Sequence, residues 1–83
     1  MFKDKETANR ISKIMLNVSE MLDESAALIE ATDCSADEKA AYYKTVGQLM
    51  GIIGIDVLNN IYRIHADIKP EEYLLPEDFK KES

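Results

Sequence analysis

The sequence predicts an all-α fold: an antiparallel hairpin of two long helices, followed by a short helical segment near the C-terminus. Apolar residues recur at helical spacing over most of the chain. There are only 3 glycines and 2 prolines, and both prolines come after residue 69. A length of 83 residues fits one domain, which we place over residues 1–83.

The first helix is predicted over about residues 5–32, where neither glycine nor proline occurs. Its apolar residues occupy three neighbouring heptad positions, with Ser25 completing the first set. This gives a wide apolar stripe, which is typical of helices in globular bundles rather than of a narrow coiled-coil seam. The apolar residues are Ile11 and Val18, then Ile14, Met21 and Leu28, then Met15, Leu22 and Ile29.

A second helix is predicted to begin after Ser35. Ser35 and Glu38 have the spacing of a capping box, in which each side chain bonds a backbone amide of the other residue. We expect this helix to run over about residues 36–68 and to stop before Pro70. Its apolar stripe contains Tyr43, Val46, Met50, Ile53, Val57, Leu58, Ile61, Ile64 and Ile68.

The middle of the second helix is apolar on nearly all sides, so one neighbouring helix is not enough to cover it. Its three glycines cost about 1 kcal/mol each relative to alanine, and the close approach of another helix can offset this. The pattern predicts a homodimer in which the second helices cross and two hairpins form a four-helix bundle. Alternatively, the glycines admit bulky side chains of the first helix. The predicted interface is Gly47, Met50, Gly51, Ile52, Gly54, Ile55 and Leu58.

After Pro70, a short helical turn is predicted over about residues 70–75, with Pro70 at its first position and Pro76 ending it. Residues 77–83 are predicted to form a frayed polar tail. The Tyr73–Leu75 segment is an alternative to a partner chain as the cover for Leu49, Ile52 and Ile55.

The formal charge of −6 disfavours nucleic acid and anionic membrane surfaces as partners. The longest apolar run, residues 46–55, is shorter than the roughly 20 residues of a spanning helix. With no secretory leader and one free cysteine, a cytoplasmic location is expected. Residues 20–38 carry seven acidic side chains and no Lys or Arg, which indicates either a solubilising surface or a docking site for a basic protein.

No arrangement of residues predicts catalysis, a cofactor or a metal. The single histidine, His65, lies at the edge of the apolar stripe, where a hydrogen-bonded structural role is the first interpretation. The alternative is a small-ligand, metal or enzyme site at the dimer interface, near His65, Tyr62 and Asn59. Arg63 and Asp67 have the spacing of an ion pair on one helix face.

The stretches Val46–Gly51 and Val57–Pro70 resemble a group of small, uncharacterised bacterial all-helical proteins. The resemblance covers about a third of the chain and implies a bacterial source and a helical fold, without an activity. Taken together, the sequence favours a self-associating protein–protein interaction module, such as a small adaptor, accessory or regulatory subunit.

Overall fold

The computed structural model describes residues 1–80, with side chains up to Asp78. In this part of the chain all regular structure is helical, which confirms the predicted class. The first helix, α1 (Lys5–Glu30), begins after Asp4, whose side chain accepts a hydrogen bond from the Thr7 amide at 2.9 Å. It ends two residues before the predicted limit at residue 32.

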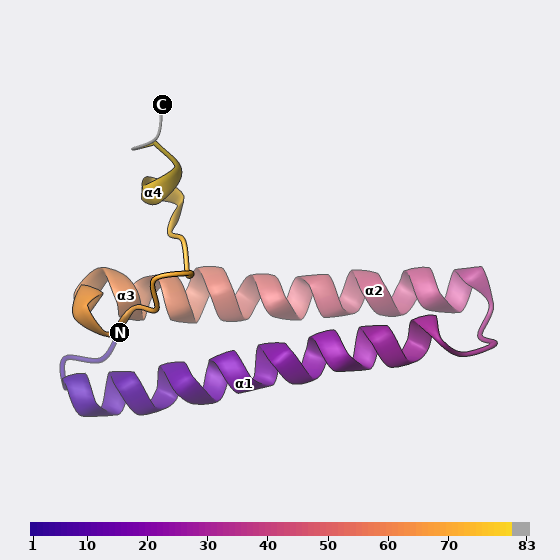
Figure 1. Cartoon of the computed structure of the whole chain (residues 1–83), viewed down its shortest axis with the longest axis horizontal. Helices are drawn as coiled ribbons and strands as arrows, with labels where there is room; N and C mark the ends of the chain where they lie inside the picture. Colours follow the sequence, from indigo (N-terminus) through magenta and orange to yellow (C-terminus); the bar gives the residue numbers. More distant parts are fainter. Residues whose placement is uncertain (81–83) are drawn as a thin grey trace.

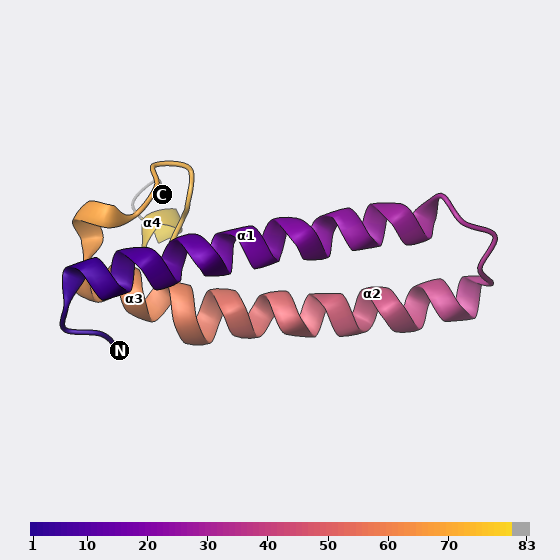
Figure 2. The ribbon, with the colours of Figure 1, turned by 90° about the horizontal axis from the view of Figure 1, so that it is seen from below.

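The next helix, α2 (Ala36–Gly51), begins where the sequence predicts. The Glu38 amide donates to the Ser35 hydroxyl, and the Ser35 amide donates to the Glu38 carboxylate, both at 3.2 Å. Figures 1 and 2 show α1 and α2 side by side, connected at one end by the short loop of residues 31–35. This loop reverses the chain direction, so residues near the N-terminus lie level with residues beyond 50.

The predicted continuous α-helix to residue 68 is wrong beyond Gly51. Residues Ile52–Leu58 form a π-helix, η1, in which the Asn59 amide donates to the Gly54 carbonyl five residues earlier. A short α-helix, α3 (Asn59–Ile64), follows, and His65 leaves helical geometry before the 3₁₀ turn η2 (Ala66–Ile68).

The π-helix changes which side chains of the following helix are buried. A π turn contains one residue more than an α turn, which offsets the later residues by about 100° around the axis. Tyr62, which lies outside the predicted stripe, is fully buried, whereas Ile64, which the sequence placed in the apolar stripe, is 52% exposed. A wheel drawn at constant angle does not include this offset.

The C-terminal predictions also need correction. Residues 70–75 form a turn followed by an irregular stretch, not a helical turn. Pro76 begins a helix instead of ending one: α4 (Pro76–Lys80) replaces the predicted frayed tail, whose residues 81–83 lie outside the described residues. The amide of Leu75 donates to the Asp78 carboxylate at 2.9 Å, which caps the start of α4. Figure 1 shows α4 extending away from the α1–α2 pair.

The hydrophobic core lies at one end of the molecule, which we call the core end (residues 2–16 and 53–75). Its buried apolar residues are Ala8, Leu58, Ile61, Tyr62 and Leu75, with Phe2, Ile11, Met15, Leu16, Ile53, Val57, Ile68 and Tyr73 packed around them. The remaining part, the loop half (residues 17–52), has Val46 as its one buried apolar residue. The chain therefore has a core over only part of its length.

Candidate functional site

The glycine-containing face of α2 is open. A Cβ atom built on Gly47 or Gly51 would meet no other residue within 4 Å. The alternative that these two glycines admit side chains of the first helix is therefore wrong. Gly54 differs, because a Cβ there would lie 3.8 Å from the Tyr73 hydroxyl.

Large apolar side chains surround this open face. Ile52 is 54% exposed and Ile55 is 66% exposed. Leu49 is also exposed, but it lies about 160° around α2 from Gly51. The sequence predicted that either a partner chain or the Tyr73–Leu75 segment covers these three residues. In the monomer, the Tyr73–Leu75 segment leaves them exposed. We call the set Gly47, Gly51, Ile52 and Ile55 the glycine surface.

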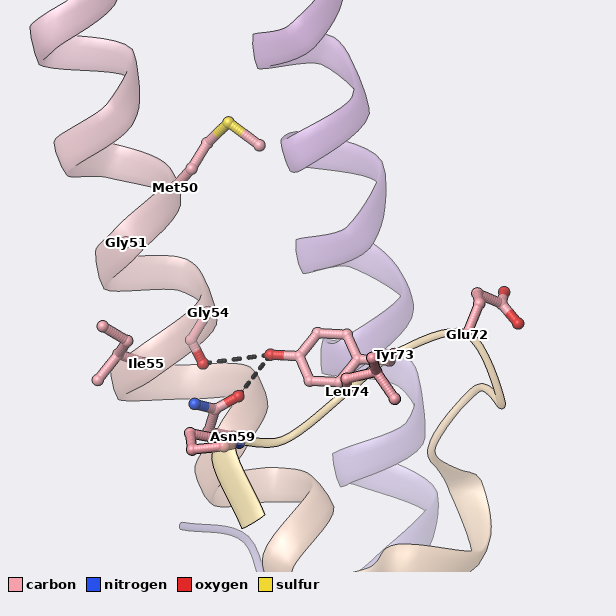
Figure 3. A pocket seen from close by; sticks show the side chains of 9 residues that line it. Met50, Gly51, Gly54, Ile55, Asn59, Glu72, Tyr73 and Leu74 are labelled. Atoms are coloured by element: carbon pink, nitrogen blue, oxygen red, sulfur yellow. Dashed lines mark hydrogen bonds between the residues drawn. The ribbon is translucent and has the colours of Figure 1, made fainter. Parts of the chain in front are cut away.

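Two shallow grooves meet on the glycine surface. One, of about 400 Å³, lies between Gly51 and Ile55 on one wall and Tyr73 and Leu74 on the other (Figure 3). The second, of about 450 Å³, is lined by Gly51, Ile52 and Ile55 with two polar residues at its rim. Because Gly51 and Ile55 line both grooves, they lie at the centre of a continuous open apolar area.

The structure separates the predicted interface residues into two groups. Gly47, Gly51, Ile52 and Ile55 are open to a partner, and Met50 is half-buried beside them. Leu58 is 2% exposed within the chain's own core, so its prediction as an interface residue is wrong. Gly54 lies under the Tyr73 hydroxyl and belongs to the contact between η1 and the C-terminal segment.

Tyr73 is the main residue that sequence reasoning missed. Its hydroxyl donates to the Asn59 side-chain oxygen at 2.6 Å and lies 3.4 Å from the Gly54 carbonyl (Figure 3). Its ring meets the ring of Tyr62 edge to face, with centroids 4.9 Å apart. Burial raises the pKa of the Tyr73 hydroxyl above its ordinary value.

The alternative ligand site near His65, Tyr62 and Asn59 is occupied by the chain itself. The Nε2 atom of His65 lies 2.7 Å from the Phe2 carbonyl oxygen, so this nitrogen carries the proton and donates. The Asn59 side chain accepts a hydrogen bond from the Tyr73 hydroxyl. Tyr62 is fully buried, and its ring contacts the ring of Tyr73. These contacts fasten the terminal segments to α3, while Asn59 also lines the first of the two grooves.

Ion pairs at the core end also connect the termini to α3 and η2. The predicted pair of Arg63 with Asp67 is wrong: Arg63 bonds the Glu77 carboxylate through Nη2 at 2.7 Å and Nε at 3.3 Å. Asp67 instead pairs with Lys5 of α1. The hydrogen bonds to Lys5 and Arg63 lower the pKa of the Asp67 and Glu77 carboxyls, respectively.

Neither a metal site nor a membrane span is visible in residues 1–80. The His, Cys, Asp and Glu side chains described there form no group of three that could hold a metal ion. None of the described helices is both long enough and apolar enough to cross a bilayer.

Comparisons with known proteins add no family assignment. No protein-family model, curated protein or solved structure matches the chain. The resemblance to small bacterial helical proteins stays a prediction.

Proposed function

We propose that this protein is a self-associating helical module, in which the two long helices act as an antiparallel hairpin that pairs with a second copy through the glycine surface. Such a dimer would serve as an adaptor, accessory or regulatory subunit for another protein. The observation that carries the proposal is the exposed apolar area around Gly51, which no described part of the chain covers.

The shape of the monomer supports association. Its radius of gyration is 15.3 Å, against about 12 Å for a compact domain of 83 residues. Its accessible surface is 6084 Å², whereas a folded monomer of 9.4 kDa is expected to expose about 5,000 Å². The difference, roughly 1,100 Å², exceeds the roughly 800 Å² that each partner buries in an interface of standard size.

The glycines give a reason for the location of the interface. Gly47 and Gly51 are both part of α2, where each lowers helix stability by about 1 kcal/mol relative to alanine. A four-residue spacing puts both on one face, and their missing side chains let a second helix approach closely. Ile52 and Ile55 would then be buried at the sides of the crossing.

The single cysteine, Cys34, is free, which fits a reducing compartment such as the cytoplasm. The proposal includes no catalytic step, because the one histidine has a structural partner.

Sedimentation mass across a dilution series tests the proposal. We expect the wild-type mass to fall on dilution from an oligomer toward the 9.4 kDa monomer. Gly51→Leu should raise the dissociation constant about tenfold or more, because the side chain fills the crossing point. Ala41→Leu, which also places a leucine on α2 but at an exposed position six residues before Gly47, is the control and should leave the constant unchanged.

Gly51→Ala should change monomer stability and association in opposite directions. Alanine should stabilise the monomer against urea by up to about 1 kcal/mol, since it favours the helix. The same methyl group should weaken association. A monomeric wild type, or a Gly51→Ala variant that is more stable and associates equally well, would contradict the proposal.

A further inference from the structure

The π-helix η1 is held by a residue that lies outside it. Its π turn is closed by the Asn59 amide, which donates to the Gly54 carbonyl. The Tyr73 hydroxyl contacts the same two residues: it donates to the Asn59 side-chain oxygen at 2.6 Å and lies 3.4 Å from the Gly54 carbonyl oxygen. One side chain of the C-terminal segment therefore contacts both ends of the turn that contains the extra residue (Figure 3).

The sequence offers this part of the chain a second helical register. If residues 52–64 formed an ordinary α-helix, α3 would rotate by about 100° and advance by about 1.5 Å. Each place toward the core would then be taken by the preceding residue. Ile61 would replace Tyr62, and Ile64 would replace His65. We call this arrangement the α register and the one in the structure the π register.

The α register removes two unfavourable features of the π register. Ile64 is 52% exposed in the π register, although it continues the apolar stripe of Val57 and Ile61. Tyr62 is fully buried, and its hydroxyl has no hydrogen-bond partner among the described residues. A buried hydroxyl without a partner is unfavourable, and π-helices are rare. Contacts from outside the helix therefore have to stabilise the π register, and the hydroxyl of Tyr73 makes such contacts.

We propose that residues 52–64 switch between these two registers and that Tyr73 is the latch that holds the π register. The switch couples the two ends of the chain. In the π register, Nε2 of His65 donates to the Phe2 carbonyl at 2.7 Å, and rotation of α3 turns His65 away from this partner. Displacing Tyr73 therefore releases the N-terminal segment, because both contacts stabilise the same one of two states. The switch operates within one chain and does not depend on the proposed self-association.

Chemical modification of the single histidine measures the switch in the full chain. His65 is 8% exposed in the π register and becomes accessible in the α register. Its rate of acylation by diethyl pyrocarbonate therefore reports the population of the α register. Tyr73→Phe removes the hydroxyl and keeps the ring. At a dilution that gives monomers, this variant should raise the rate about fivefold, which is the effect of losing one hydrogen bond.

Two isoleucines distinguish a change of register from a loosening of the core end. Ile64 is buried only in the α register, so Ile64→Gln, added to Tyr73→Phe, should return the rate of His65 close to the wild-type value. Ile52 is 54% exposed, nearly the same as Ile64, but it is the first residue of η1 and precedes the rotation. Ile52→Gln in the same background is therefore the matched control and should leave the faster rate unchanged.

Deletion of Asp56, an exposed residue of η1, provides a second test. The deletion removes the extra residue, so an ordinary α-helix then keeps Tyr62 and His65 buried. In the deletion variant, adding Tyr73→Phe should leave the rate of His65 unchanged. A Tyr73→Phe chain whose His65 reacts no faster than in wild type would overturn the latch. A faster rate that Ile64→Gln does not slow, or that also appears in the deletion variant, would overturn the switch of register.

Discussion

The core end and the loop half share α1, which pairs with η1 and α3 at the core end and with α2 in the loop half, but they differ in what holds them together. At the core end, both termini return to α3, and apolar burial is reinforced by the bonds of His65, Tyr73 and Arg63. In the loop half, the tie between helices is polar and lies near the surface: the Tyr42 hydroxyl donates to Ser25 at 2.7 Å, and Lys39 donates to the Glu30 carbonyl at 3.2 Å. Two paired helices alone bury too little apolar surface to form a core. A core exists only where the terminal segments also pack against α3.

The largest expected effect is at the centre of the core end. Ile61→Ala should lower the free energy of unfolding by about 2–5 kcal/mol, because Ile61 is fully buried. Chains of this size hold roughly 3–5 kcal/mol, so the variant should be largely unfolded. Leu28→Ala in the loop half should change the free energy of unfolding of the monomer by less than about 0.5 kcal/mol. Urea unfolding at a dilution that gives monomers checks both, and equal losses would contradict the division into two regions.

The hydrogen bond of His65 should have the next largest effect. His65→Ala leaves the Phe2 carbonyl without its partner and should cost about 1–3 kcal/mol. His65→Gln retains a donor and should lose less. Amide hydrogen exchange should show the loss of protection in the first turns of α1. An unchanged exchange pattern in His65→Ala would mean that the N-terminal segment is held by other contacts.

Removing the hydroxyl should have different effects on stability at Tyr73 and at Tyr62. Tyr73→Phe removes the donor to Asn59 and should lower stability by about 1 kcal/mol, with faster exchange of amides in η1. The Tyr62 hydroxyl is buried without a hydrogen-bond partner, so Tyr62→Phe should be neutral or slightly stabilising. Equal losses in the two variants would contradict the hydrogen bonding described for this site.

The smallest expected effect is a pH dependence of the exposed ion pairs. The pKa values of Asp67 and Glu77 are lowered in the folded chain, so these carboxyls stabilise it above their unfolded pKa of about 4. This contribution should be lost as the pH falls through the lower folded values. Urea midpoints between pH 7 and pH 2.5 measure it, with Asp67→Asn combined with Glu77→Gln as the control. A wild type that follows the same pH profile as this variant would contradict the two pairs.

The helical class and the start of α2 could be predicted because they depend on local signals. The Ser35 capping box is complete within four residues. The register of α3 could not be predicted in the same way, because a π-helix inserts one residue into a helix whose composition is unchanged. Ile64 was consequently assigned to the buried side of the molecule, although it is 52% exposed.

The start of α4 could also have been predicted from the sequence. Proline is favoured in the first turn of a helix, and Pro76 is followed by two acidic residues, Glu77 and Asp78, as is typical of such a start. The contact of Tyr73 with Gly54 and Asn59 is different, since it joins residues 14 or more positions apart through the path of an irregular segment. No periodicity in the sequence indicates where such a segment returns.

The return of both termini to α3 has a consequence for the order of folding. The bond between Phe2 and His65 joins residues 63 positions apart, and Leu75 completes the same core. Contacts of such separation form slowly and need almost the whole chain, whereas the two helices of the loop half are neighbours in sequence. During synthesis the loop half therefore leaves the ribosome and can pair before the core end exists. We expect nascent chains to expose the apolar residues of the helix pair for that interval, when a second copy or a chaperone can bind them.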